Sequence, residues 1–233
     1  MALDIIFLSY DEPNADINFS NLATRFPYVK RVHGVQGIAN AHKAAAEVSD
    51  TRFFYVIDGD TEVLPNFDFT YKPETWDQDY VHIWRARNPV NGLEYGYGGV
   101  KLFSKKFFKN LTANSVDFST SLTKDVKYLE EVVSITHFNS DEFRAYRGAF
   151  RECAKLASKS IEGQVDQETE QRLHTWCNVA DKSQFYWKFV LRGANAGLMF
   201  GLSNTGNPEE LKKVNDFNWL KDRFEKSQGN AEN

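Results

Sequence analysis

The stretch Arg52-Phe53-Phe54-Tyr55-Val56-Ile57-Asp58-Gly59-Asp60-Thr61-Glu62-Val63 decides the fold. Its first half is a run of aromatic and β-branched residues, which is typical of a strand buried on both faces. Asp58 and Asp60 follow at the carboxyl end of this strand, and Gly59 lets the chain turn there without a Cβ clash. Ligands of open α/β sheets bind outside the carboxyl ends of the strands, so the sequence predicts a site at this turn.

The residues before this strand alternate between strand and helix patterns. Short apolar strands are predicted over 4–9 and 29–35, and helices over 16–25 and 38–48. Together with the strand before Asp58 they form a βαβαβ series, which implies a parallel sheet with right-handed crossovers. The fold class is therefore predicted to be α/β with a mostly parallel, Rossmann-like sheet.

The residues after this strand change character along the chain. Strands are predicted over 80–87 and 100–104, separated by a glycine-rich loop over 92–99, and residues 105–125 have no clear pattern. After Tyr128 the pattern becomes helical, and Asn139 is predicted to be an N-cap with Glu142 at the third helical position. Helices are expected over 140–160, 167–176, 184–190 and 208–224. The predicted organisation is a core over 1–125, a helical part over 126–225 that completes the site, and a frayed polar tail over 226–233, with a single domain as the alternative.

The composition of the chain limits the partners and the cellular compartment that are expected for it. The net charge of −4 gives no global attraction to nucleic acid, so any such partner must be held by local basic patches. Cys153 and Cys177 have no metal-type spacing, and we interpret them as reduced thiols of a cytoplasmic protein. The sequence contains no apolar run of membrane-spanning length and no basic segment at its start, so neither a membrane partner nor a signal peptide is expected. The oligomeric state stays open.

The Asp58-Gly59-Asp60 turn has a chemistry of its own. Mg²⁺ and Mn²⁺ prefer hard oxygen ligands, often one or two carboxylates together with substrate phosphates. Asp58 and Asp60 are the predicted metal ligands, and His137 or His174 is a candidate to complete the shell. The alternatives are an ordinary acidic turn whose carboxylates bind nearby amides, and histidines with no role beyond surface or core.

Three motifs at predicted strand ends together resemble the nucleotide-sugar-binding half of GT-A fold glycosyltransferases, especially family-two-like members. They are Ser9-Tyr10-Asp11-Glu12, the helix start Gly37-Ile38-Ala39-Asn40-Ala41-His42-Lys43-Ala44-Ala45, and Asp58-Gly59-Asp60. The resemblance covers about residues 3–70 and implies a UDP-sugar donor and a Mn²⁺ or Mg²⁺ cofactor. His42 and Lys43 stand where the family has Arg and Asn, and a cation there suits a diphosphate. The donor-binding residues that it implies are Ser9, Tyr10, Asp11, Lys43, Asp58 and Gly59, with an ordinary Asx turn as the alternative for Tyr10 and Asp11. Arg144 and Arg147 are added as donor-binding candidates by the helical spacing of a basic stripe.

Catalytic roles are assigned to two carboxylates. Asp60 holds the cation that neutralises the departing diphosphate, and Asp58 binds metal, ribose or both. Asp141 is the candidate general base because it stands at a helix start, although capping is an alternative role for a carboxylate at that place. Basic residues at helical spacing form a stripe that can grip phosphate or, alternatively, make a solvated helix face: Arg144, Arg147, Arg151 and Lys155.

A second resemblance concerns the acceptor. The segments 7–14, 32–45 and 150–156 are similar to those of T-even-type bacteriophage GT-A proteins, which implies transfer of glucose or arabinose to 5-hydroxymethylcytosine in DNA, in the host cytoplasm. Trp84 and Tyr97 are candidates for a flat acceptor surface. Further basic residues that suit nucleic acid are Arg85, Arg87, Lys101, Lys105, Lys106 and Lys109. The alternatives are a saccharide or protein acceptor, a nucleotidyltransferase, which would need a glycine-rich phosphate loop where Tyr10 to Glu12 stand, and a non-catalytic GT-A-like nucleic-acid-binding module.

Overall fold

The computed structural model describes residues 2–96, 99–109, 111, 116–161 and 163–229. The chain folds into two compact units. Unit 1 comprises residues 1–88, 94–113 and 118–137, and unit 2 comprises residues 89–93, 114–117 and 138–233. The boundary therefore falls after residue 137 instead of the predicted 125.

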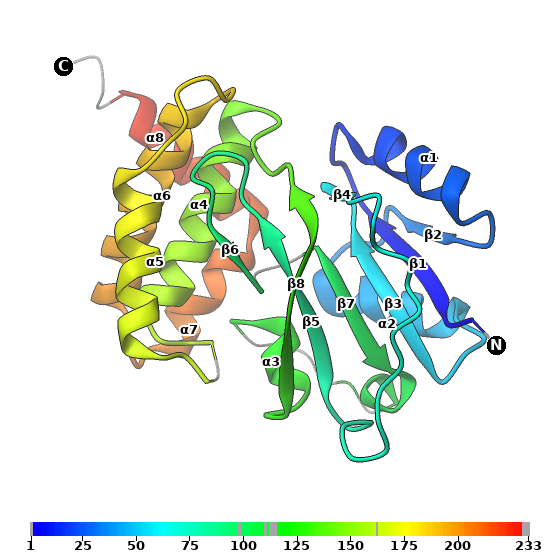
Figure 1. Ribbon diagram of the computed structural model, residues 1–233. Helices are drawn as coiled ribbons and strands as arrows, with labels where there is room; N and C mark the ends of the chain where they lie inside the picture. The colour runs from blue at the N-terminus through cyan, green and yellow to red at the C-terminus, as the bar shows by residue number, and fades with distance from the viewer. Residues whose placement is uncertain (1, 97–98, 110, 112–115, 162, 230–233) are drawn as a thin grey trace. The chain divides into compact units, whose positions relative to one another are not determined.

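Unit 1 is built on one mixed sheet with the strand order β2-β1-β3-β7-β5-β8-β4, and β6 pairs with β5 (Figure 1). Its strands are β1 (Asp4–Ser9), β2 (Lys30–His33), β3 (Phe53–Asp58), β4 (Thr61–Val63), β5 (Val81–Arg87), β6 (Glu94–Tyr95), β7 (Val100–Ser104) and β8 (Val126–Thr136). Its helices are α1 (Ala15–Arg25), α2 (Ile38–Val48), the 3₁₀-helix η1 (Lys105–Phe108) and α3 (Phe118–Leu122).

The sheet is parallel where the sequence predicts it. β1 pairs in parallel with both β2 and β3, and β5 pairs in parallel with β8. β7 is antiparallel to β3 and to β5, so β1, β2, β3, β5 and β8 all run in the same direction. The predicted α/β class with a mostly parallel sheet is confirmed, as is the βαβαβ start.

The strand before Asp58 is buried on both faces, as its sequence predicts. Phe53, Tyr55 and Ile57 pack in one core cluster with Ala15 and Leu22 of α1. The alternate residues Phe54 and Val56 pack in a second cluster with Ala45 and Ala46 of α2. Side chains alternate across a strand, so α1 and α2 cover opposite faces of the sheet.

Strand β8 corrects the expected helical pattern after Tyr128. Residues 126–136 are extended, pair with β5 and β4, and belong to unit 1. The β-branched residues Val132, Val133, Ile135 and Thr136 favour a strand, but the acidic pair before them hides the alternation. The register also shifts beside Trp84 and Arg85 of β5, which further disturbs the period.

Unit 2 is helical, as predicted, with α4 (Glu142–Ala157), α5 (Asp166–Asn178), α6 (Trp187–Ser203), α7 (Pro208–Leu211), the 3₁₀-helix η2 (Lys212–Asn215) and α8 (Phe217–Gly229). The single helix predicted over 208–224 is interrupted because Asp216 Oδ1 accepts the Asn218 and Trp219 amides at 2.9 and 3.1 Å and starts α8. α8 extends to Gly229, so the prediction that residues from 226 onward fray is wrong for 226–229. Residues 230–233 lie outside the described part of the chain.

The centre of unit 2 is the contact between α4 and α6. Tyr146, Phe150, Cys153 and Leu156 of α4 are each 1% exposed or less. A Cβ on Gly193, Gly197 or Gly201 of α6 would lie under 3.0 Å from a backbone oxygen of α4. Glycine at every fourth position therefore lets the two helix backbones touch. Within the described residues, no helix is long and apolar enough to cross a membrane.

Candidate functional site

Two turns meet at the carboxyl ends of β1 and β3. Leu8 of β1 pairs with Asp58 of β3, so the chain leaves both strands at the same edge of the sheet. A Cβ on Gly59 would lie 2.6 Å from Glu12 Oε2 and 3.0 Å from Ser9 Cβ. Glycine at position 59 therefore lets the turn after β3 lie against the turn after β1 without displacing the Glu12 side chain.

Ser9 closes the end of β1 against β2. Ser9 Oγ accepts from Arg31 Nε at 3.0 Å and lies 3.0 Å from His33 Nδ1. The Gly34 amide also donates to the Ser9 carbonyl at 3.0 Å. The hydroxyl predicted to bind the donor is thus 4% exposed and engaged in holding two strand ends together.

The turn after β1 exposes the groups predicted to hold a nucleoside. The Tyr10 amide donates to Glu12 Oε2 at 2.8 Å, which fixes the turn. The Tyr10 side chain is 48% exposed, and Asp11 is exposed beside it. A half-exposed phenol ring next to a carboxylate can stack on a base and accept hydrogen bonds from a nucleoside.

Asp58 is held by a cation from a neighbouring strand. Lys101 Nζ of β7 donates to Asp58 Oδ2 at 2.8 Å, and the Gly99 amide donates to the same oxygen at 3.3 Å. Burial raises the pKa of Asp58, but the charge and hydrogen bond of Lys101 outweigh it and hold that pKa below its ordinary value. Lys101 is only 8% exposed, so the sequence-based assignment of this lysine to a nucleic-acid surface is wrong.

Asp60 and His137 face each other across the start of β4 and the end of β8. The His137 amide donates to the Asp60 carbonyl at 2.8 Å, which continues the β4–β8 ladder. His137 Nε2 lies 2.7 Å from Glu62 Oε2. The predicted ligand His137 is therefore brought next to Asp60 by the sheet, while its ring contacts a carboxylate that the sequence analysis did not consider.

The carboxylates of the turn suit an open divalent-cation site. Within the described residues, no three His, Cys, Asp or Glu side chains are close enough together to hold a metal ion. Mg²⁺ and Mn²⁺ do not require such a cage, because they usually keep waters and take one or two carboxylates together with substrate phosphates. Asp60, with Asp58 two residues before it, fits that kind of open site. His174, the other histidine considered, is exposed on α5 of unit 2.

Of the two neighbouring residues of α2, His42 lies in the core and Lys43 lies on the surface. His42 is 3% exposed, packs against the rings of Phe103 and Phe118, and has Nδ1 2.8 Å from the Ile38 carbonyl. Because a carbonyl only accepts, Nδ1 carries the proton. Burial, with the Lys101 charge as the second cause, lowers the pKa of His42 to about 4, so this residue is not a cation for a diphosphate. Lys43 is exposed.

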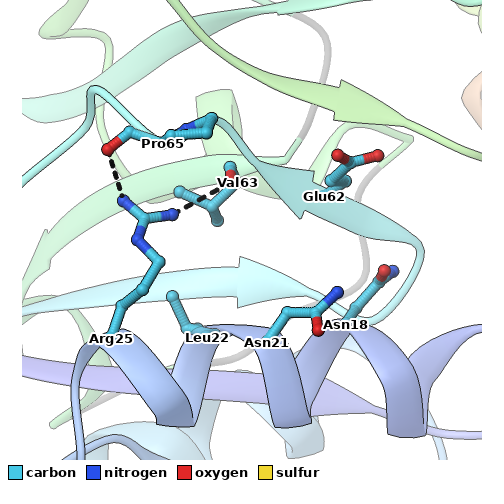
Figure 2. A pocket seen from close by; sticks show the side chains of 7 residues that line it. All are labelled: Asn18, Asn21, Leu22, Arg25, Glu62, Val63 and Pro65. Carbon is cyan, nitrogen blue, oxygen red and sulfur yellow. Dashed lines mark hydrogen bonds between the residues drawn. The ribbon is translucent and has the colours of Figure 1, made fainter.

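A pocket of about 170 Å³ adjoins the turn and was missed by the sequence analysis. Figure 2 shows Asn18, Asn21 and Arg25 of α1 facing Glu62 and Val63 of β4. Asn18 Nδ2 donates to the Gly59 carbonyl at 3.1 Å, and Arg25 donates to the Val63, Pro65 and Phe67 carbonyls. The only signal in the sequence was polar residues three and four apart on one helix face, which is usual for a solvated helix.

Asp141 is the N-cap of α4, so the prediction that Asn139 caps this helix is wrong. Asp141 Oδ1 accepts from the Arg144 amide at 2.7 Å, and Asp141 Oδ2 pairs with the Arg144 guanidinium. Asn139 Nδ2 instead donates to the Phe185 carbonyl at 3.1 Å. Both residue types suit an N-cap, and the cap falls two residues later than expected.

The basic stripe of α4 is largely engaged inside unit 2. Arg151 donates to the Val214 carbonyl at 3.0 Å and to Asn215 Oδ1 at 2.9 Å. Lys155 pairs with Asp117 at 3.1 Å, and the Arg147 guanidinium lies 5.5 Å from the Phe217 ring centre. These cations hold η2, the start of α8 and Asp117 against α4, which explains their spacing without any phosphate.

Several residues predicted to face an acceptor have other roles. Trp84 is 2% exposed and packs against Tyr55, Phe67 and Tyr71, so it is a core residue and not an acceptor surface. Tyr97 lies outside the described residues. Four of the basic residues considered for nucleic acid have partners inside unit 1: Arg85 pairs with Glu130, Arg87 with Glu94 and Lys106 with Asp79, and Lys105 donates to the Ser49 carbonyl.

Comparisons with known proteins give likenesses of structure only. No protein-family model and no curated protein sequence matches the chain. A glycosyltransferase involved in glycosylation of the major capsid of PBCV-1 matches with a TM-score of 0.39 and 12% identity over 64% of this chain and 98% of its own. The mannosyltransferase PcManGT from Pyrobaculum calidifontis, in complex with GDP-Man and Mn²⁺, matches with a TM-score of 0.45 and 10% identity over 87% and 76%. HddC from Yersinia pseudotuberculosis matches with a TM-score of 0.32 and 19% identity over 54% and 69%. With TM-scores below 0.5, these likenesses leave the function to be inferred from the site itself.

Proposed function

We propose that this chain is a metal-dependent glycosyltransferase that moves a sugar from a UDP-sugar to an acceptor hydroxyl. One observation carries the proposal: the turns after β1 and β3 contact each other and gather Tyr10, Asp11, Asp58 and Asp60 at the carboxyl edge of the sheet. This edge is where open α/β sheets bind nucleotides. Its chemistry combines a ring for a base with carboxylates for a ribose and a cation.

The two aspartates of the turn are assigned different tasks. Asp60 is the residue that would hold Mn²⁺ or Mg²⁺, and such a cation supplies charge neutralisation to the leaving diphosphate. Asp58 already has its charge balanced by Lys101 at 2.8 Å, so its task is to accept hydrogen bonds from the ribose or to support the turn. Lys101 is a positioning residue in this proposal because it fixes the Asp58 carboxylate before any donor binds.

The acceptor in the proposal is 5-hydroxymethylcytosine in DNA, to which glucose or arabinose would be transferred in the cytoplasm of an infected host. Its support is the sequence resemblance to phage proteins. The surface charge gives little added support, since most of the basic residues considered for DNA are paired with carboxylates or carbonyls. A saccharide or protein acceptor would leave the assigned roles at the donor turn unchanged.

The test is a thermal-shift measurement of the full chain with UDP, UDP-glucose and UDP-arabinose, each with Mn²⁺ and with EDTA. A ligand that binds only the folded state raises the melting temperature by mass action. We expect a shift that requires Mn²⁺ in the wild type and is absent in Asp60→Asn. The matched control is Glu47→Gln, which removes an exposed carboxylate from α2 of the same unit and should behave as wild type.

No metal-dependent shift with any of these nucleotides would overturn the proposed donor site. A shift of equal size in Asp60→Asn would keep a nucleotide site but remove the metal assignment. Metal-dependent hydrolysis of the UDP-sugar by the wild type would exclude a non-catalytic binding module, and incorporation of nucleotide with release of pyrophosphate would point to a nucleotidyltransferase.

A further inference from the structure

An exposed aromatic segment leads into α6 in unit 2. It comprises residues 181–188, Asp-Lys-Ser-Gln-Phe-Tyr-Trp-Lys, whose last two residues begin α6, and is called the aromatic loop below. Phe185 at its tip is 79% exposed, which is the highest value among the exposed large apolar side chains of the described residues. Burying a phenylalanine side chain is worth about 1.5–3 kcal/mol, so a partner that covers this ring would gain binding free energy from it.

Hydrogen bonds hold the backbone of the aromatic loop at Asp181 and at Phe185, although the Phe185 side chain is exposed. The Asp181 amide donates to the Val90 carbonyl at 2.6 Å, and Asp181 Oδ1 accepts from the Ser183 amide and hydroxyl. Asn139, which is 9% exposed, donates to the Phe185 carbonyl itself at 3.1 Å. Tyr186 has a left-handed backbone with φ of 60°, which is uncommon for a residue with a side chain. The backbone therefore presents the Phe185 ring outward in a fixed way.

Two lysines lie close to Trp187, which follows Phe185 by two residues. Lys182 Nζ and Lys188 Nζ are each 5.7 Å from the ring centre of Trp187. Neither lysine forms an ion pair within the part of the chain that the structure describes, in contrast to Arg144 and Lys155 of α4. The carboxylate of Asp181 is occupied by Ser183, so the aromatic loop offers aromatic rings together with unpaired positive charge.

We propose that the aromatic loop binds a nucleic-acid strand, with Phe185 stacked on an unpaired or extruded base and Lys182 and Lys188 on the adjacent phosphates. This inference rests on the proposed transfer to DNA and names the surface that would contact the acceptor. Stacking of a base on an aromatic side chain is worth about 1–3 kcal/mol, and lysines beside it supply the salt-dependent part of binding. Apolar side chains also serve as wedges between base steps, which helps an enzyme reach a base inside a duplex.

The small size of the aromatic loop, and not its charge, favours nucleic acid over a membrane surface, because its lysines would suit the anionic groups of either. Membrane attachment scales with buried apolar area, and even one acyl chain gives only marginal binding. A single projecting ring buries too little apolar area to attach the protein to a membrane. The same ring is large enough to stack on one unpaired base.

The experiment measures binding of the full chain to fluorescently labelled single-stranded and duplex oligonucleotides that carry 2-aminopurine. Phe185→Ala is expected to weaken binding about ten- to hundredfold and to remove the change in 2-aminopurine emission caused by stacking. Phe185→Trp should restore both, because it keeps a flat ring. The matched control is Met199→Ala, which removes a 63% exposed apolar side chain of α6 and should bind as the wild type does.

A second variant tests the phosphate contacts. Lys182→Ala with Lys188→Ala should lower the slope of log Kd against log salt by about 1.4 for single strands, since each phosphate contact contributes about 0.7. An unchanged slope would remove the lysines from the interface and overturn that part of the inference.

The outcomes separate this inference from the proposed glycosyl transfer. Donor binding, measured as the metal-dependent shift with a UDP-sugar, should be the same in Phe185→Ala and in wild type. If the donor shift is present but Phe185→Ala binds DNA as tightly as wild type, the aromatic loop is not the acceptor surface and the proposed function stands. If wild type binds the donor but no oligonucleotide, or binds only vesicles of anionic lipid through Phe185, the inference is wrong. Loss of the donor shift in wild type overturns the proposed function instead.

Discussion

The Asp58-Gly59-Asp60 turn of unit 1 and the α4–α6 pair of unit 2 both contain glycine at a close contact. The two contacts differ in the kind of atom that a Cβ would meet. A Cβ on Gly59 would meet the end of the Glu12 side chain and Ser9 Cβ. A Cβ on Gly197 would meet the backbone of Phe150. A side-chain end can move away at little cost, whereas the backbone of a packed helix cannot. The first glycine makes room for functional groups, and the second fixes the architecture.

The same contrast holds for charge. In α4 the cations are tied to other segments of unit 2, as Arg151 is to Val214 and Asn215 of η2, and Lys155 is to Asp117. In the turn, the pair between Lys101 and Asp58 instead fixes a carboxylate beside Asp60, at the carboxyl edge of the sheet. The α4 cations therefore have a structural task inside their own unit. Functional tests should begin with the carboxylates of the turn and with the aromatic loop, and not with the α4 stripe.

The largest expected effect separates the two aspartates of the turn. Asp60→Asn should lower turnover of the UDP-sugar about 10²- to 10³-fold, because loss of one group that stabilises developing charge typically costs that much. Asp58→Asn should have a smaller effect on turnover and a larger effect on stability, since it leaves the Lys101 ammonium, whose side chain is 11% exposed, without its partner. Donor hydrolysis and chemical denaturation of both variants measure this. A greater loss of turnover in Asp58→Asn would reverse the assignment.

The two glycines provide the next test. Gly197→Ala should lower the free energy of unfolding by about 3 kcal/mol, the upper part of the range for overpacking, and Tm by roughly 6–12 °C. Gly59→Ala should change the free energy of unfolding by less than about 1 kcal/mol, because the Glu12 side chain can rotate away. Calorimetry of both variants, with exposed Met199→Ala as reference, measures the difference. Equal losses at the two glycines would show that the turn is as tightly packed as the helix pair.

His42 gives a pH dependence that should be specific to the core behind the turn. Burial, with the Lys101 charge second, lowers its folded-state pKa to about 4, below the unfolded value of about 6.5. The unfolded chain therefore binds the proton first, and stability is lost as pH falls from about 6.5 towards 4. At pH 5 the loss from this residue is about 2 kcal/mol relative to pH 7.5.

The measurement is urea denaturation at pH 7.5 and pH 5. His42→Phe should show a fall in stability smaller by about this amount than the fall in the wild type. His174→Gln, at an exposed position of α5, should follow the wild type. An identical pH dependence in His42→Phe and wild type would contradict the low pKa.

The parts of the fold that were predicted correctly depend on local patterns. The run before Asp58 and the alanine-rich helix 38–48 have their period and their ends within one short window, and both formed as predicted. β8 was missed because its pairing partners, β5 and β4, lie far away in sequence and Glu130 and Glu131 interrupt its apolar pattern.

The candidate site shows the same limit. The sequence places Asp58 and Asp60 at a strand end, but it does not show that Lys101 of an antiparallel neighbour reaches Asp58. Trp84 and Lys101 were considered for function because aromatic and basic residues suit ligands. Only the sheet reveals that both are buried. Sequence thus locates chemical groups, whereas pairing between distant strands decides which of them remain available.

The smallest expected effect concerns Asp141. Its carboxylate is either a structural N-cap of α4 or the general base of the transfer reaction. Its oxygens accept from the Arg144 amide and pair with the Arg144 side chain, so Asp141→Ala should cost about 1 kcal/mol as a lost N-cap. Asp141→Asn and Asp141→Ser keep the capping oxygen and should cost only a few tenths. If Asp141 acts only as an N-cap, activity per folded molecule should be unchanged in all three variants. A general base requires the carboxylate itself, so Asp141→Asn would lose transfer about 10²- to 10⁴-fold while Tm stays near that of wild type. Measuring Tm and acceptor transfer for Asp141→Asn and Asp141→Ala side by side therefore decides whether α4 contributes chemistry or only structure. If Asp141→Asn keeps full activity, the catalytic carboxylates are those of the turn of unit 1.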